Sequence, residues 1–273
     1  MTRISNFFKT AVIFSLSLFT ITGCVSDSYY SKIKERGKII IGVPKDYAPF
    51  SYRKEEKDKK GEKGELTGYD IECAKLVGKK LKMKILFKEM DNDKIVPALD
   101  AGKIDATVNQ QYVNFKIDPD KDEKPDYYFS YPYKYSRLTC VVRKNNTELK
   151  HFDDQRDLKI AMTQGDFFED SVLNDGGIIL KQKNTDDCFK AVETGKADGT
   201  MNDLLAFQYY MKKHPDANLK SSVLSANLYG LNYMTKSEEL SLKLTSAIKK
   251  IRNDGSLSDL SKRLFHQDIS VKS

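Results

Sequence analysis

The feature that most constrains the fold is an alternation of short β-branched segments with amphipathic helical segments, which occurs twice along the chain. In the first half the order is strand, helix, strand, helix, strand. We predict these elements at residues 38–43, 71–81, 83–87, 95–101 and 104–108. Such alternation favours a parallel sheet with helices on its faces. The first half therefore predicts an α/β unit.

A second α/β unit follows, joined to the first near residues 131–137. We predict its strands at residues 138–142, 158–162, 178–181 and 198–201, and its helices at 167–173, 185–194 and 204–212. The end, residues 237–265, is predicted to be helical with a break at Asn253-Asp254-Gly255. The charged segment from Arg53 to Glu65 predicts an exposed hairpin tip. Two wound units predict two lobes, and a cleft between lobes is a common place for a ligand.

The N-terminal segment has the pattern of an export signal. Arg3 and Lys9 precede an apolar run at residues 10–22, which is too short to span a bilayer comfortably. Small residues directly before Cys24 resemble the lipobox of bacterial lipoproteins, which implies cleavage before Cys24 and acylation of its thiol. The alternative is an ordinary secretory signal with an incidental cysteine. We predict a lipoprotein signal peptide at 1–23 and a tether at 24–37 that includes an opening helical turn. We further predict an extracytoplasmic protein anchored to a bacterial membrane, in the periplasm or at the cell surface.

Composition excludes several classes of function. The formal net charge is +7, but lysines alternate with acidic residues and no basic stripe carries interleaved aromatics, so a nucleic-acid partner is not expected. Cys73, Cys140 and Cys188 are an odd number in an exported chain, which leaves at least one thiol unpaired; Cys140 and Cys188 pair only if their segments adjoin. Their spacing matches no zinc motif, so we expect no metal and no cofactor.

Six short motifs occur in a fixed order between residues 38 and 265. They are Tyr47-Ala48-Pro49-Phe50, Gly68-Tyr69-Asp70-Ile71, residues 95–99 with 102–106, Phe129-Ser130-Tyr131-Pro132-Tyr133, residues 195–199 with Asp203, and Asn253-Asp254-Gly255-Ser256. In this order they resemble the bacterial extracellular solute-binding proteins of the polar amino-acid type. Each motif alone is weak, but together they cover most of the chain.

The resemblance implies a two-lobed, type II periplasmic-binding-protein-like α/β fold, in which each lobe is a mixed, mostly parallel sheet with flanking helices. It implies lobe 1 at residues 38–133 plus 229–273 and lobe 2 at 134–228. It also implies a monomeric receptor, not an enzyme, which captures an amino acid by closure of its lobes. The receptor delivers this ligand to an ABC permease.

The family grips the ligand α-carboxylate with an arginine in a Thr-x-x-Arg segment, and here that position falls at Ile117. Lys116, Lys121 or Lys124 is a possible substitute, as a point charge without the guanidinium fork. The second-lobe Gly-Thr of the family becomes Gly165-Asp166. A frequent aromatic residue becomes Asn92, while the ammonium-binding aspartate persists as Asp203.

Other candidate contacts follow strand ends, where loops of such sheets face clefts. Asp166 and Asp203 have a second interpretation, because each also fits the capping of a helix. If both face the cleft, they repel a ligand carboxylate and favour an amine or a cation. The ligand is then an amino acid held by a lysine, or a solute without a free carboxylate. The predicted ligand-binding residues are Tyr47, Phe50, Asn92, Asn109, Gln110, Tyr112, Lys116, Gly165, Asp166, Phe167 and Asp203.

Two alternative functions are open on the sequence alone. The first is an enzyme on the same fold, similar to a cyclohexadienyl dehydratase, with Asp166 or Glu169 as a general acid of raised pKa. The second is a sensor or adhesin module whose cleft has degenerated. No nucleophile elbow, P-loop or zinc motif supports an enzyme of another type.

Overall fold

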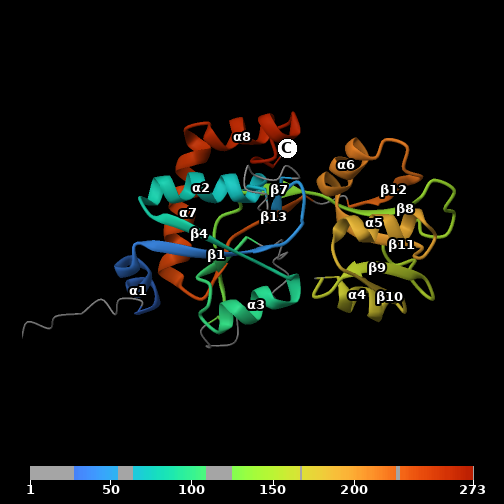
Figure 1. Ribbon diagram of the computed structural model, residues 1–273, viewed down its shortest axis with the longest axis horizontal. Helices are drawn as coiled ribbons and strands as arrows, with labels where there is room; N and C mark the ends of the chain where they lie inside the picture. Colours follow the sequence, from blue (N-terminus) through green and yellow to red (C-terminus); the bar gives the residue numbers. More distant parts are fainter. Residues whose placement is uncertain (1–27, 55–63, 109–124, 167, 226–227, 273) are drawn as a thin grey trace, which may run out of the picture.

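The protein consists of two α/β lobes joined by extended segments, as the computed structural model shows (Figure 1). The structure describes residues 28–54, 64–108, 125–166, 168–225 and 228–272. Each lobe contains one five-stranded sheet with helices packed on its faces. This arrangement confirms the two-lobed α/β fold predicted from the sequence.

The sheet of lobe 1 is mixed, with its long strands parallel. Its strands, in spatial order, are β4 (Lys84–Met90), β1 (Lys38–Pro44), β5 (Ala106–Thr107), β14 (Met234–Thr235) and β6 (Tyr128–Phe129). Strand β1 runs parallel to β4 and β5, whereas β14 is antiparallel to β5 and β6. The antiparallel strand β14 comes from the C-terminal part of the chain, so the chain returns to lobe 1 after building lobe 2.

Helices cover both faces of this sheet. One group comprises α2 (Tyr69–Leu81), α7 (Glu238–Asn253) and α8 (Ser256–Phe265), and the other face carries α3 (Asn92–Asp100). Helix α2 buries Ile71, Ala74 and Val77, which recur at helical spacing, and it ends at Lys82, whose φ of 54° is left-handed. Apolar periodicity in the sequence is therefore the cause of this packing.

The first described element corrects the predicted tether. Residues Ser28–Arg36 form helix α1, which precedes β1 directly. Its side chains Tyr30 and Ile33 are buried in the core of lobe 1. The segment from Ser28 onward therefore belongs to the lobe, because two apolar residues three apart give even this lysine-rich helix a buried face.

Lobe 2 repeats the plan with a different strand order. Its strands, in spatial order, are β10 (Ile178–Gln182), β9 (Lys159–Thr163), β11 (Gly199–Asp203), β8 (Leu138–Arg143) and β12 (Leu219–Leu224). Helices α5 (Thr185–Glu193) and α6 (Leu204–Lys213) pack on one face, and α4 (Glu169–Asn174) packs on the other. The edge strand β12 was not predicted, because its polar sequence Leu-Lys-Ser-Ser-Val-Leu lacks a β-branched run.

The three described cysteines are free and buried. Cys140 packs in the core on the α4 face of the lobe 2 sheet, and Cys188 packs in the core on the α5 face. The sheet separates the two side chains, so the Cys140–Cys188 pairing left open by the sequence is not formed. Burial raises the pKa of the Cys140 thiol to about 12, which keeps it protonated and inert.

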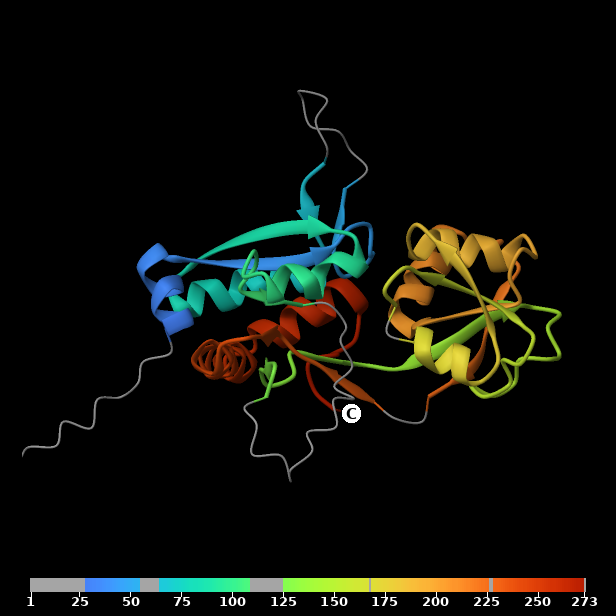
Figure 2. The ribbon, with the colours of Figure 1, turned by 90° about the horizontal axis from the view of Figure 1, so that it is seen from below.

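Two short strands connect the lobes. Strand β7 (Lys134–Ser136) leads into lobe 2 and pairs antiparallel with β13 (Tyr229–Leu231), which leads back (Figure 2). The C-terminal segment braces this hinge, since the Tyr135 backbone N–H donates to the Ile269 carbonyl at 2.7 Å. A further hairpin, β2 (Tyr52–Arg53) with β3 (Leu66–Thr67), forms the base of the predicted exposed hairpin, whose tip lies outside the described residues.

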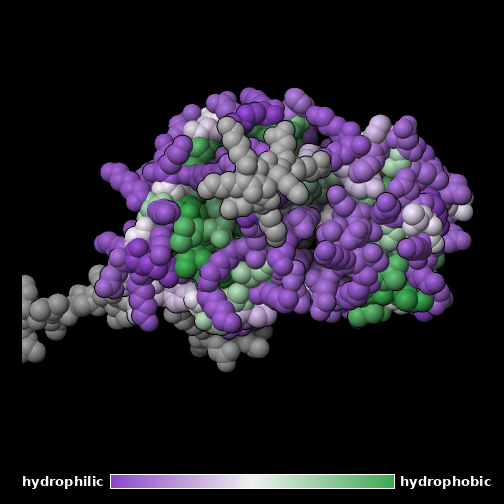
Figure 3. All heavy atoms as spheres, viewed as in Figure 1, coloured by the Kyte–Doolittle hydropathy of each residue, from purple (hydrophilic) through white to green (hydrophobic). Residues whose placement is uncertain are grey.

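The surface seen in Figure 3 is mainly hydrophilic. An apolar patch lies over α4 and β10, where Leu173 and Ile178 are 57% and 51% exposed. Among the described helices, none combines the length and apolar character that a bilayer crossing requires.

A buried ion pair lies at the hinge. The ammonium of Lys134 lies 2.9 Å from a carboxylate oxygen of Asp70, and the two side chains are 0% and 2% exposed. The same ammonium sits 3.3 Å from the ring centroid of Phe50, a favourable cation–π geometry. Phe50 was predicted to line the cleft. It lies instead in the core of lobe 1 with no exposed surface, because its ring covers this ammonium.

We expect Lys134→Met to lower the free energy of unfolding by about 3–5 kcal/mol, because it leaves the Asp70 carboxylate buried without its cation. Urea unfolding at neutral pH measures the loss. Lys80→Met is the matched control, since Lys80 pairs with Asp254 at the surface and its removal costs less than about 1 kcal/mol. Adding Asp70→Asn to Lys134→Met should restore part of the loss. Equal losses in the two single variants would contradict this role of the hinge pair.

Candidate functional site

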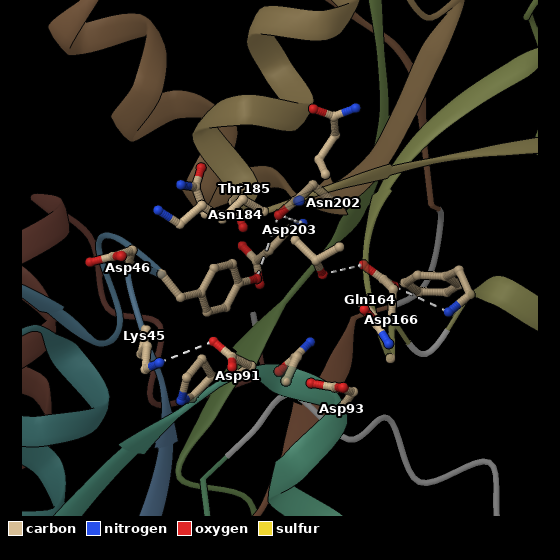
Figure 4. A pocket seen from close by; sticks show the side chains of 18 of the residues that line it. Lys45, Asp46, Asp91, Asp93, Gln164, Asp166, Asn184, Thr185, Asn202 and Asp203 are labelled. Atoms are coloured by element: carbon tan, nitrogen blue, oxygen red, sulfur yellow. Dashed lines mark hydrogen bonds and ion pairs between the residues drawn. The ribbon is translucent and has the colours of Figure 1, made fainter.

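A polar pocket of about 530 Å³ lies between the lobes (Figure 4). Lobe 1 contributes residues 44–47 and 91–94. Lobe 2 contributes Leu138, residues 163–166, Phe168, residues 182–185 and residues 201–203. Every wall therefore comes from a strand end, a short loop or the first turn of a helix.

The topology explains this location. The lobe 1 segments follow the carboxyl ends of β1 and β4, and most lobe 2 segments lie at the carboxyl ends of β9, β10 and β11. These strands are parallel within their sheets, so their carboxyl ends share one edge in each lobe. Ligands of open α/β sheets bind outside such edges. Here two of these edges face each other.

Two aromatic contacts cross between the lobes. The Tyr47 hydroxyl, after β1, donates to the Asn202 side-chain oxygen in β11 at 3.5 Å. Outside the pocket, the rings of Tyr52 in β2 and Tyr209 in α6 lie 5.8 Å apart. Burial, together with the Tyr209 hydroxyl, raises the pKa of Tyr52 to about 12. Each contact joins a residue of lobe 1 to a residue of lobe 2, so both form only while the lobes are close.

Asp203 occupies the junction of β11 and α6. One carboxylate oxygen accepts from the Leu205 backbone N–H at 2.8 Å and caps the helix. The other oxygen lies near the Ser136 hydroxyl but has no well-aligned partner among the described residues. The residue is 1% exposed, and burial raises the pKa of its carboxyl group while Lys134 opposes the rise. Asp203 thus lines the pocket with one oxygen committed to the fold and the other buried without a partner in the described part of the chain.

Asp166 is held by its own loop. Its carboxylate accepts from the Phe168 backbone N–H at 3.2 Å and from the Thr163 hydroxyl at 3.4 Å. Its backbone N–H donates to the Glu169 carboxylate at 3.0 Å, and Glu169 in turn pairs with Lys181. Burial raises the pKa of Asp166 to about 6. These contacts hold Asp166 in a local turn before α4, whose N-cap is Phe168, so Asp166 does not cap the helix, and the residue lines the pocket.

Gly165 is a point of direct contact between the lobes. Its φ is 72°, a left-handed conformation that glycine adopts without cost. A β-carbon at this position would lie 2.7 Å from the Cα atom of Asp93, at the start of α3. The glycine therefore permits both the local turn and the approach of α3.

The lobe 1 wall is charged. The Asp91 carboxylate pairs with Lys45 at 3.1 Å and with Lys94 at 2.7 Å. Next to it, the side-chain oxygen of Asn92 is buried without a hydrogen-bond partner in the described part of the chain. Helix α3 begins at Asn92, three residues earlier than predicted, so the Asn92 side chain is positioned by the first turn of the helix.

The structure brings five predicted site residues to one pocket: Tyr47, Asn92, Gly165, Asp166 and Asp203. Phe50 is in the core, as described above. Asn109, Gln110, Tyr112, Lys116 and Phe167 lie outside the described residues, as does Cys24. Sequence reasoning missed polar residues that line the same pocket, namely Gln164, Gln182, Asn184, Thr185 and Asn202. Each lies within four residues after the end of a predicted strand of lobe 2, which was a usable signal.

The described lining is acidic. Asp46, Asp91, Asp93, Asp166 and Asp203 outnumber Lys45, Lys94 and Lys183, and no arginine or histidine lines the described part of the pocket. Carboxylate and amide oxygens accept hydrogen bonds from ammonium donors. Within the described ranges, no group of three histidine, cysteine or acidic side chains is arranged to hold a metal ion.

Two hinged lobes that enclose a polar pocket define a receptor for a small solute. The comparisons agree with this class: residues 39–267 match the family model of the bacterial extracellular solute-binding proteins, family 3. The chain belongs to this family. A probable amino-acid ABC transporter-binding protein of Haemophilus influenzae is 27% identical, and the match covers 96% of this chain and 98% of the relative.

Two solved structures bear on the arrangement of the lobes. An ancestral arginine-binding protein bound to arginine is 27% identical, with a TM-score of 0.71 over 84% of this chain and 99% of the other. The L-cystine solute receptor of Neisseria gonorrhoeae, in its unliganded open conformation, is 29% identical, with a TM-score of 0.55 over 90% and 100%. At similar sequence identity, the TM-score is higher for the ligand-bound structure than for the open one, so the arrangement of the lobes here is more similar to the ligand-bound one. The contacts of Gly165 with Asp93 and of Tyr47 with Asn202 agree with a closed state.

We expect Gly165→Ala to disfavour the closed arrangement, because the new β-carbon would overlap the backbone of Asp93. Small-angle X-ray scattering should give a larger radius of gyration than for the unmodified protein under the same conditions. Gly195→Ala is the matched control: its φ is 76°, so it has the same backbone strain of about 1–2 kcal/mol, but its β-carbon would meet only a flexible Arg143 nitrogen at 3.7 Å. A radius that changes equally in both variants would rule out a closure effect.

We also expect the free energy of unfolding of Asp166→Asn to depend on pH in a different way from that of the unmodified protein. Folding raises the pKa of Asp166 to about 6 from an ordinary value near 4, so its stabilising contribution is present below about pH 4 and is lost as the pH rises through 6. Asparagine cannot ionise. From pH 4 to pH 7, the free energy of unfolding of Asp166→Asn should therefore gain about 1–2 kcal/mol relative to the unmodified protein. Urea unfolding across this range measures it, and a difference that stays flat or falls contradicts it.

Proposed function

We propose that the protein is a lipid-anchored receptor that captures an amino acid or a related solute bearing an ammonium group and delivers it to an ABC permease. One observation carries the proposal: Asp203 lines the pocket, and its second carboxylate oxygen is buried without a well-aligned partner among the described residues. A buried carboxylate oxygen is costly unless a donor or a positive charge meets it. A ligand ammonium supplies both.

The charges around the hinge support the same assignment. Asp70 and Asp203 both interact with the single ammonium of Lys134, so this buried cluster holds two carboxylates and one cation. A ligand ammonium next to Asp203 balances the cluster. Charge balance is gained only when the lobes close over the ligand, which couples capture to closure.

The ligand carboxylate, where there is one, needs a donor that is not the usual arginine. Ile117 replaces that arginine in the sequence. Lys183, which lines the pocket in lobe 2, is one candidate, and Lys116 remains the other. Both provide a point charge, so we propose weaker carboxylate selectivity than a bidentate guanidinium would give. The relatives named above, which bind arginine or L-cystine, show the kind of solute that this fold accepts.

We place the receptor outside the cytoplasm, held at a membrane by acylation of Cys24 after cleavage of residues 1–23. The lipobox-like sequence before Cys24 supports this proposal. Metabolic labelling with palmitate should modify the unaltered protein and not Cys24→Ala. Labelling of neither would remove the anchor from the proposal and leave ligand capture untouched.

The ligand class is tested by native mass spectrometry of freshly purified protein, followed by calorimetric titration. We expect binding of L-arginine, L-lysine, L-cystine or a diamine in preference to L-glutamate, because the described pocket carries more carboxylates than ammonium groups. Preferential binding of L-glutamate would contradict the electrostatic argument. A receptor without a working cleft, such as a degenerate sensor, would show no thermal shift with any solute of a broad library.

Asp203→Asn should weaken ligand binding at least about thirtyfold, because the loss of one partner of a buried charge-assisted contact costs about 2–5 kcal/mol. Asparagine still caps α6, so the free energy of unfolding should change little. Asp203→Ala is the matched comparison: it should lose binding and also about 1 kcal/mol of stability. Unchanged affinity in Asp203→Asn, measured by calorimetry with the co-purified solute, would refute the role of Asp203.

A second candidate function is a dehydratase-like enzyme, and the raised pKa of Asp166 is the observation that favours it. A carboxylic acid with a pKa of about 6 is suited to general acid catalysis. Both of its oxygens already accept hydrogen bonds within the loop, which favours the receptor instead. Turnover of a prephenate-like substrate that is lost in Asp166→Asn would support the enzyme.

A further inference from the structure

The end of lobe 1 that points away from lobe 2 lies only a few residues along the chain from Cys24. Helix α1 forms this end of the molecule in both ribbon views (Figures 1 and 2). It begins at Ser28 and is fixed to the lobe by Tyr30 and Ile33. Only three residues separate Cys24 from Ser28. Four residue steps span at most about 15 Å, so an anchor at Cys24 would hold this end of the lobe close to the bilayer.

Basic side chains gather at the same end. The starts of β1 and β4 lie side by side, since Lys38 is in register with Lys84 and the Lys84 N–H donates to the Gly37 carbonyl at 3.4 Å. Helix α2 ends here as well, and its last turn leads directly into β4. We call this surface the basic end. It comprises Lys32, Lys34, Lys38, Lys79, Lys82 and Lys84, all exposed except the half-buried Lys38.

These charges are largely uncompensated. Nearby, Arg36 pairs with Asp105 and Lys80 pairs with Asp254. In contrast, none of the six lysines of the basic end forms an ion pair with a described residue, and Glu35 is the exposed acid of α1. Elsewhere on the surface lysines and acids pair repeatedly, as in Lys75 with Glu72. A local excess of about five positive charges therefore covers the end of the lobe where α1 begins.

We propose that the basic end faces and binds the surface of an anionic membrane. The proposal rests on the lipid anchor of the proposed function for its geometry. A chain span of at most about 15 Å between the anchor and α1 lets the lysines approach the membrane surface to within the electrostatic screening length, which is about 8–10 Å at physiological salt. Exposed lysines close to an anionic leaflet are attracted to its headgroups, and such basic patches add to a single anchor. Between deliveries, the receptor would stand with lobe 1 towards the bilayer and lobe 2 away from it.

The test separates the surface from the anchor. The mature chain with Cys24→Ser, which cannot be acylated, is sedimented with phosphatidylcholine vesicles and with vesicles of equal parts phosphatidylcholine and phosphatidylglycerol. We expect binding to the anionic vesicles that falls with added salt, and little binding to the neutral ones. Replacing Lys34, Lys79, Lys82 and Lys84 with glutamine should weaken the anionic binding at least about tenfold.

The matched control replaces four exposed lysines of lobe 2, Lys144, Lys190, Lys196 and Lys212, with glutamine, which makes the same change in net charge. This control should bind anionic vesicles within about twofold of the unmodified chain. Equal loss in both variants, no loss in either, or equal binding to neutral vesicles would overturn the proposal. Calorimetric ligand binding, which should be unchanged in both lysine variants, reports separately on the receptor function.

Discussion

The contact between Lys134 and Asp70 is the interaction on which the arrangement of the lobes depends. Lys134 lies in β7, the first strand of the hinge, and its ammonium is enclosed by Asp70 at the start of α2 and by the ring of Phe50. Two residues later, Ser136 lies beside Asp203, the cap of α6 in lobe 2. Helix α2 of lobe 1, the hinge and the turn from β11 to α6 at the pocket are thus connected through one buried cation.

This connection gives the pocket its chemistry. A buried lysine is stabilised by nearby carboxylates, and here two buried carboxylates, Asp70 and Asp203, interact with it. Asp70 is internal, whereas Asp203 reaches the pocket. The excess negative charge is therefore directed at the ligand rather than at solvent. The proposed preference for an ammonium group follows from how the hinge is stabilised.

Much of the fold was predictable because the long strands and helices carry their own periodicity. The strand at Lys38 and the helix that ends at Leu81 were placed within two residues of their observed bounds. Strand β5 lies within the strand predicted at residues 104–108. The short strands β6 and β14 were not predicted, because two residues carry no periodicity and their pairing is set by distant segments. Helix α1 was missed as part of the lobe because lysines dominate its sequence and only two side chains face the core.

The site was predictable in part for a similar reason. Loops after strands were expected at the cleft, which located Tyr47, and the family resemblance located Gly165 and Asp203 at the same pocket. The same rule misplaced Phe50, since the sequence does not show that a buried lysine 84 residues away requires an aromatic cover. It also overlooked Asn184 and Asn202, whose short side chains have no distinctive pattern. Their importance depends on which strand ends become neighbours, and that is a property of the assembled sheet.

The contact between Tyr52 and Tyr209 has a practical consequence. The chain has 15 tyrosines and no tryptophan, so tyrosine dominates its ultraviolet emission. One ring of this pair belongs to each lobe, and the rings are 5.8 Å apart only while the lobes are together. Opening separates the two chromophores and changes their environment. The molecule thus contains an intrinsic optical probe of its own closure, without any attached dye.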